Sequence, residues 1–174
     1  MPSDRSPYSR DPIPFTVAAA HFEVPYVPAA VWAGRLDRIS SLAGALADAR
    51  TRDRLADAIL EHPGAAQDLR DESLRVLGVA GGRKWWEVAR LIRTSESPDI
   101  LGRLVLAGVD PWQRSLGEWC AAVYAVCTKG ADEKGRLKFD FSLSIPPRDF
   151  EDEWDDDGED SAATMNAVAA MMGN

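Results

Sequence analysis

The side chains that could perform chemistry are few and far apart in this sequence. The two histidines and two cysteines (His21, His62, Cys120 and Cys127) form neither a CxxC nor an HxxxH pattern, the spacings typical of zinc ligands. No GxSxG stretch marks a nucleophilic serine. We therefore predict that the chain is not an enzyme and has no catalytic, cofactor or metal site, and that both cysteines are small core residues.

Two stretches approach known binding motifs without matching them. Residues 78–84, GVAGGRK, lack the spacing of a phosphate-binding P-loop and have no hydroxyl residue after the lysine to bind magnesium. Residues 153–158 place acidic side chains at alternate positions of a calcium loop, but its twelfth position is Thr164, where a bidentate glutamate is needed. Both stretches are therefore interpreted as structural, the first as a link between helices and the second as part of an acidic segment.

The charge of the chain is concentrated near its end. Nine of the twelve residues from 149 to 160 are acidic and none is basic. The chain has 28 acidic and 20 basic residues and a net charge of −8, so removing these nine leaves 19 acidic against 20 basic residues. Because a block of like charges repels itself and buries little apolar surface, it is predicted to be a flexible arm on a neutral body. The chain has no basic stripe for nucleic acid and no apolar run long enough for a membrane, so neither is an expected partner and we expect a cytoplasmic protein.

Apolar residues recur at helical spacing through most of the body. Residues 15–27 alternate apolar and polar side chains and are predicted to be extended, at a sheet edge or as a clip across the surface, because Pro25 lacks a backbone donor. Residues 139–145 alternate again and fit either a strand or an extended strap packed on the helices. Thr51 is the expected N-cap of the second helix. Helices are predicted over residues 28–46, 51–60, 65–77, 84–94, 97–108, 110–130 and 132–138.

Two of these helices have the clearest start signals. Ser97 and Asp110 each precede a proline and are predicted to be N-caps with proline in the first turn. The first helix runs through an apolar series of Ile100, Leu101, Leu104 and Val105. The second has one stripe of helical period at residues 112, 116, 119, 120, 123 and 127.

Together these elements predict an all-α fold. We expect a small single-domain helical bundle with an extended N-terminal segment and a flexible acidic C-terminal arm. The predicted organisation is an extended or disordered leader over residues 1–27, a helical domain over 28–147, and the acidic arm with a short terminal helix over 148–174.

Tryptophans are the strongest candidates for contacts with another protein. Neighbouring residues on a helix point about 100° apart, so Trp85 and Trp86 are not expected to face the same side. One of them is predicted to be at least partly exposed beside cationic residues, the alternative being that both are absorbed by the core. Aromatic residues also interrupt the acidic run, as in acidic segments that bind basic, apolar grooves. The predicted protein-contact residues are Trp85, Trp86, Trp112, Trp119, Phe150 and Trp154.

A set of short sequence stretches points to a family. KWW at 84–86 opens a predicted helix, and it is followed by LVLAGVDP at 104–111, GEWCAAVY at 117–124, and FD at 139–140 leading to Pro146-Pro147 before the acidic run. In these stretches, and in FEVP at 22–25, the chain resembles tail assembly chaperones of long-tailed, siphovirus-type actinobacteriophages. The main resemblance covers residues 84–174.

The resemblance implies a function that composition alone does not reveal. It implies a non-catalytic protein that binds the tape measure protein and keeps it soluble during tail assembly. Such a protein acts in the host cytoplasm and is not in the mature virion. The resemblance also implies a longer form of the same protein made by programmed frameshifting, with this chain as the unshifted form, and a homo-oligomer is a further partner to consider.

Two other functions are compatible with the sequence. One is a structural virion component, such as a head–tail adaptor or minor tail protein, that uses the acidic arm for docking. The other is an acidic inhibitor that blocks the basic site of a nucleic-acid-binding protein.

Overall fold

The first elements of the chain are two antiparallel strands. The computed structural model describes Ser6 and residues 9–147, and it begins with β1 (Ile13–Val17) and β2 (Ala20–Val24). Phe15 lies opposite Phe22, and their rings stack with centroids 5.3 Å apart. The extended structure predicted from the alternating pattern is confirmed here, and residues 18–19 form the hairpin turn between the two strands.

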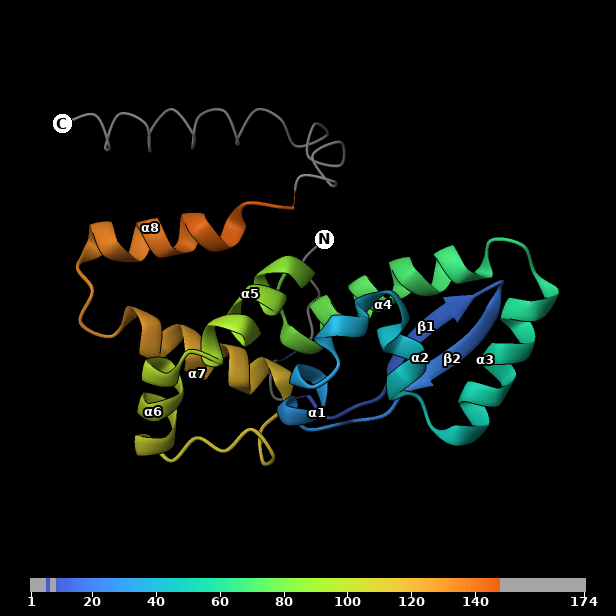
Figure 1. The fold of residues 1–174 in the computed structure, drawn as a ribbon, viewed down its shortest axis with the longest axis horizontal. Helices are drawn as coiled ribbons and strands as arrows, with labels where there is room; N and C mark the ends of the chain where they lie inside the picture. The colour runs from blue at the N-terminus through green and yellow to red at the C-terminus, as the bar shows by residue number, and fades with distance from the viewer. Residues whose placement is uncertain (1–5, 7–8, 148–174) are drawn as a thin grey trace. The chain divides into compact units, whose positions relative to one another are not determined.

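Helices form the rest of the described body, and residues up to Leu143 belong to one compact unit. The prediction of a helical fold is therefore confirmed in its main class, whereas the all-α prediction is corrected by the hairpin. After the strands come α1 (Ala29–Ala33), the 3₁₀ helix η1 (Leu36–Ser41), α2 (Leu42–Leu46), α3 (Ala49–Glu61), α4 (Ala65–Gly81), α5 (Trp85–Ser95), α6 (Pro98–Leu106), α7 (Leu116–Thr128) and α8 (Glu133–Ser144) (Figure 1).

Helix α4 is the element around which the others pack. It contacts β1, η1, α2, α3, α5 and α7, and Figure 1 shows it running behind the hairpin toward α5. Val76 and Leu77 on α4 are completely buried. Gly81, in its last turn, allows the start of the next helix to come close, because a Cβ there would lie 2.3 Å from a Val88 methyl group of α5. A 17-residue helix buried along most of its length thus connects the hairpin to the later helices.

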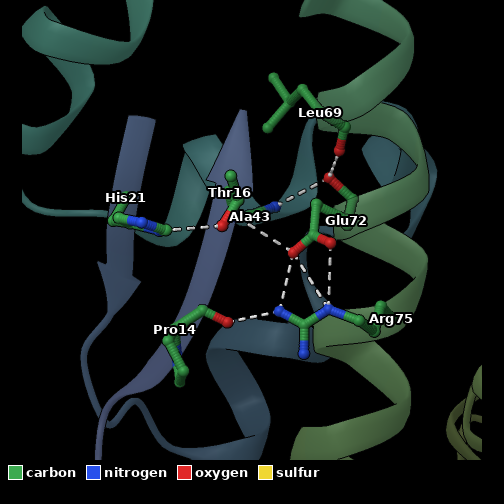
Figure 2. A network of polar contacts seen from close by, with 8 residues as sticks. Pro14, Thr16, His21, Ala43, Leu69, Glu72 and Arg75 are labelled. Atoms are coloured by element: carbon green, nitrogen blue, oxygen red, sulfur yellow. Dashed lines mark hydrogen bonds and ion pairs between the residues drawn. The ribbon is translucent and has the colours of Figure 1, made fainter. Parts of the chain in front are cut away.

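Carboxylates of α4 bind the backbone of the hairpin. The Thr16 N–H donates to Glu72 Oε2 at 3.3 Å (Figure 2). The Ala18 N–H in the turn donates to Asp68 Oδ2 at 3.1 Å. Arg75 forms an ion pair with Glu72 at 2.7 Å and also donates to the Pro14 carbonyl. The bonds to Thr16 and Pro14 pair backbone groups on the edge of β1 that does not face β2. The apolar side chains of β1 lie in the core. The hairpin is therefore part of the helical body, whereas the sequence placed it in a leader.

Residues 28–46 form three short elements and not one long helix, and buried Ser73 bonds the start of the third, α2. Its Oγ donates to the Leu69 carbonyl at 2.6 Å and accepts from the Ala43 N–H at 3.1 Å. Helix α2 has no side-chain cap of its own at Ser41, so α4 supplies the acceptor for its first turn. The chain is also non-helical at Arg38 (φ −114°, ψ 38°). Tertiary contacts override the continuous helical pattern here.

Residues 139–144 are helical, which corrects the prediction of a strand or strap. Phe139 and Leu143 face the body, and a spacing of four fits both a helix and an alternating strand. Arg90 donates to the carbonyls of Ser142 and Leu143 at 2.6 and 3.0 Å, which satisfies the C-terminal end of α8. The alternation alone did not distinguish the two structures.

The N-cap of α3, the second predicted helix, lies three residues before the expected cap, Thr51. Asp48 is the N-cap of α3, and its carboxylate accepts from both the N–H and the hydroxyl of Thr51. These bonds lower the pKa of Asp48. Thr51 is therefore the donor in the capping interaction and not the cap.

The hairpin turn is strained because Ala18 and Ala19 have φ of 49° and 62°. This is the two-residue turn that favours Asn-Gly. We expect Ala18→Asn combined with Ala19→Gly to raise the free energy of unfolding by about 1–2 kcal/mol, measured by urea denaturation. Ala56→Gly in the exposed part of α3 is the matched control and should lower it by about 1 kcal/mol. If the free energy of unfolding of the turn variant is unchanged or lower, the backbone of Ala18 and Ala19 does not destabilise the protein as proposed.

Candidate protein-contact surfaces

Trp119 is a core residue, which corrects its prediction as a contact. It lies in α7 and is only 4% exposed. Its indole N–H donates to Ser95 Oγ at 3.3 Å, and that hydroxyl donates in turn to the Ile92 carbonyl of α5. Because both polar groups are buried and bonded, Trp119 holds α7 against α5 and is not available to a partner.

Trp85 and Trp86 form a partly exposed aromatic pair at the start of α5. Trp85 packs against the core, and the two rings meet edge to face with centroids 5.8 Å apart. The Lys84 ammonium lies 5.1 Å from the centroid of the Trp86 ring, within range of a cation–π interaction. The pair thus combines an aromatic surface with positive charge, as expected from the sequence.

The junction between α4 and α5 fixes the position of this pair. Gly82 has φ +64° and ends α4 in a left-handed turn, and the Arg83 N–H donates back to the Gly78 carbonyl at 3.2 Å. The Arg83 guanidinium lies 5.0 Å from the Tyr124 ring centroid of α7 and 3.4 Å from the Glu87 carboxylate. The glycine-rich stretch is therefore a helix link, as interpreted from the sequence, and it fixes the start of α5, where the aromatic pair lies.

Trp112 lies in a turn before α7, whereas the sequence placed it in the helix. Asp110 Oδ1 accepts from the Trp112 N–H at 2.9 Å, and the helix starts only at Leu116. The carbonyls of Pro111 and Arg114 accept from the first N–H groups of α1, so the turn is tied down at both ends. As a result Trp112 is 65% exposed on an ordered segment.

A capping box explains the late start of α7. Ser115 Oγ accepts from the Glu118 N–H at 3.2 Å, while the Glu118 carboxylate accepts from the Ser115 N–H at 2.7 Å. The hydrogen bond from the Ser115 backbone lowers the pKa of Glu118. This reciprocal cap satisfies two backbone donors at the buried end of α7, so it prevails over the Asp110-Pro111 signal.

The predicted contact residues are thus divided among different environments. Trp85 and Trp86 are brought together, and Trp112 belongs to a separate turn. Trp119 is in the core, and Phe150 and Trp154 lie outside the described residues. The partly or largely exposed tryptophans among the described candidates therefore come from two segments, the start of α5 and the turn before α7.

Sequence analysis missed a third apolar surface, on α6. Leu104 is completely buried, but Leu101, Val105 and Leu106 are 44%, 65% and 89% exposed. The sequence pattern grouped Leu101 and Val105 with Leu104 in one apolar series and did not separate the buried side of the helix from the exposed side. The available signal was that α6 carries more apolar residues than one buried stripe needs. Leu101, Gly102, Val105 and Leu106 are called the α6 face below.

The thiols and histidines show little capacity for chemistry. Burial raises the pKa of Cys120 to about 12 and also raises the pKa of Cys127, so neither thiol is activated. His21 Nδ1 lies 3.2 Å from Thr16 Oγ1 on the hairpin surface. Within Ser6 and residues 9–147, no group of three or more histidine, cysteine or acidic side chains is arranged to hold a metal ion. None of the helices in the same residues has the length and apolarity to cross a membrane.

Comparisons with known proteins do not add an identification. No family model, curated protein or solved structure matches the chain.

The state of the two thiols can be checked directly. We expect Cys120 to be unreactive toward Ellman's reagent in the native protein near pH 8, because it is buried and protonated, and Cys127 to react more slowly than free cysteine. Both should react in denaturant, and Cys120→Ser serves to assign the slow phase. Rapid reaction of Cys120 in the native protein would contradict the buried position of α7.

Proposed function

We propose that the chain is a non-catalytic tail assembly chaperone of a long-tailed phage that binds the tape measure protein and keeps it soluble. The observation that carries this proposal is the display of aromatic side chains on constrained segments, one at the start of α5 and one in the turn before α7. Trp112 is 65% exposed in a turn bonded to α1, and Trp86 is partly exposed beside Lys84. Exposed tryptophans on an ordered segment suit protein binding, because little conformational entropy is lost when they are buried.

The client in this proposal is a long helical protein whose apolar stripes are uncovered until the tail tube encloses them. An amphipathic helix presents such stripes at intervals of three and four residues. Trp86 and Trp112 provide apolar area for these stripes, and Lys84 adds a cation for acidic groups beside them. A buried aromatic anchor of this kind contributes about 2–4 kcal/mol to binding.

The acidic run has a second role in the proposed mechanism. Its nine carboxylates give the client complex a net negative charge, and mutual repulsion keeps such complexes apart. Phe150 and Trp154, both within the run, are the proposed arm residues that bind basic, apolar patches of the client. The host cytoplasm is the proposed site of action, and the frameshifted longer form is a proposed second partner.

Co-expression with a tape measure protein tests the contact assignment. We expect Trp86→Ala and Trp112→Ala each to lower the soluble fraction of the client, because loss of a 2 kcal/mol anchor weakens affinity by about 30-fold. Removal of residues 149–174 should lower it as well. Leu60→Ala is the matched control, since Leu60 is 85% exposed on α3 and lies on neither tryptophan segment.

The outcomes separate the parts of the proposal. If the parent keeps the client soluble and all three variants do so equally well, the contact residues are wrong. If the parent has no effect on the client, or if the chain is present in purified virions, the chaperone function is wrong. Circular dichroism of each variant checks that the fold is kept.

A further inference from the structure

The α6 face is an apolar helix surface with no charged residue in it. Relative to the buried Leu104, Gly102 and Leu106 point about 160° away on either side, directly outward. Leu101 and Val105 extend the face on one flank. Exposures of 44%, 65% and 89% for its three large side chains show that the described parts of the chain leave this face uncovered.

Gly102 in the middle of this face is not explained by the fold of one chain. Its φ is not positive, and a Cβ at this position would meet no atom within 4 Å. Glycine inside a helix costs about 1 kcal/mol relative to alanine. A residue without a side chain at the outermost point of an apolar face allows the backbone of another helix to approach closely.

The charges beside the face identify the partner. Asp99 and Arg103 lie on the flank opposite Leu101 and pair with each other along the helix at 3.0 Å, with more than half of each side chain exposed. An interface with two-fold symmetry places the same patch of both copies in contact, so residue i meets residue j twice. In an antiparallel pair of α6 helices with the axis near Leu101, Asp99 of each copy lies beside Arg103 of the other.

We propose that the α6 face is a dimerisation surface whose occupant is the α6 face of a second copy of this chain, packed antiparallel. A partner that presents only positive or only negative charge can pair with just one of Asp99 and Arg103. A second copy of the chain presents both charges and can pair with both residues. The helix is nine residues, or about 13 Å, long, so the buried area is small and the dimer is weak. We expect a dissociation constant of about 10–100 μM.

Sedimentation of the full chain over a range from about 1 to 500 μM tests the dimer. A concentration-dependent shift from monomer to dimer is expected. Val105→Asp should weaken association by at least about tenfold, because it places a charge from each copy within the apolar contact. Leu60→Asp on α3, at a similarly exposed leucine, is the matched control and should leave the equilibrium unchanged. The proposal is overturned if the chain stays monomeric over the whole concentration range. The α6 face would then bind a partner other than a second copy.

Charge reversal tests the antiparallel arrangement. Asp99→Arg gives the flank two cations and Arg103→Asp gives it two anions, so each variant alone should dimerise about tenfold more weakly. An equimolar mixture of the two should form a heterodimer, and the double variant that exchanges both charges should dimerise like the parent. Equal association by all of these proteins, or no heterodimer in the mixture, would show that the helices do not meet this way.

The Gly102→Ala variant distinguishes an effect on dimerisation from an effect on the stability of the monomer. In the monomer the new methyl group enters open space and the helix gains propensity, so the melting temperature measured at low concentration should rise. In the dimer the same methyl group lies at the closest approach of two helices, so association should weaken by several-fold. If the variant gains stability and dimerises as well as the parent, Gly102 is not at the contact and the proposed packing is wrong. This test is independent of the tape measure protein.

Discussion

Helix α4 must pack against the hairpin on one side and against other helices along the rest of its length, and it must also pair their backbone groups. The arrangement of the body depends on this one helix. Apolar residues such as Val76 and Leu77 supply the packing. Polar residues of the same helix accept hydrogen bonds from backbone N–H groups of neighbouring elements. Glu72 accepts from the Thr16 N–H of β1, and Ser73 accepts from the Ala43 N–H of α2. Since a buried donor left without an acceptor costs about 1–3 kcal/mol, these few bonds determine where the short elements sit.

The two ends of the body use their apolar residues differently. At the hairpin, the phenylalanine pair and the alternating aliphatic residues are almost completely covered. At the α5–α7 end, Trp119 is buried, but Trp86, Trp112 and the α6 face remain partly or largely exposed. The strands therefore bury their apolar side chains, whereas several apolar side chains near α5–α7 stay exposed, as does Leu60 on α3. This distribution supports both proposals, because each assigns a protein partner to an exposed apolar feature at that end.

The two proposed interactions also differ in character. The two tryptophan segments are the start of α5, where Lys84 adds a cation beside Trp86, and the turn before α7. Apolar area with a nearby cation suits a series of amphipathic helices. The α6 face is uncharged, and the opposite charges on its flank are self-complementary, which suits an identical copy. Pairing two bodies would also bring two acidic runs and two sets of tryptophans to one client, which increases avidity when both sets can bind together.

The sequence by itself determined the mainly helical class, the extended N-terminal segment, the glycine link before α5 and the concentration of negative charge at residues 149–160. These features depend on local preferences, such as helical periodicity, glycine in left-handed turns and repulsion between neighbouring carboxylates. Only the tertiary structure decided which of two competing local signals prevailed. Helix α7 begins after Ser115 and not after Asp110, because the reciprocal bonds of Ser115 and Glu118 satisfy backbone groups at its buried end. Residues 139–144 are helical, because Arg90 bonds the carbonyls at the end of α8. The tertiary structure also decided which side of α6 faces water and that Trp119 is in the core, since exposure depends on neighbours that are distant in the sequence.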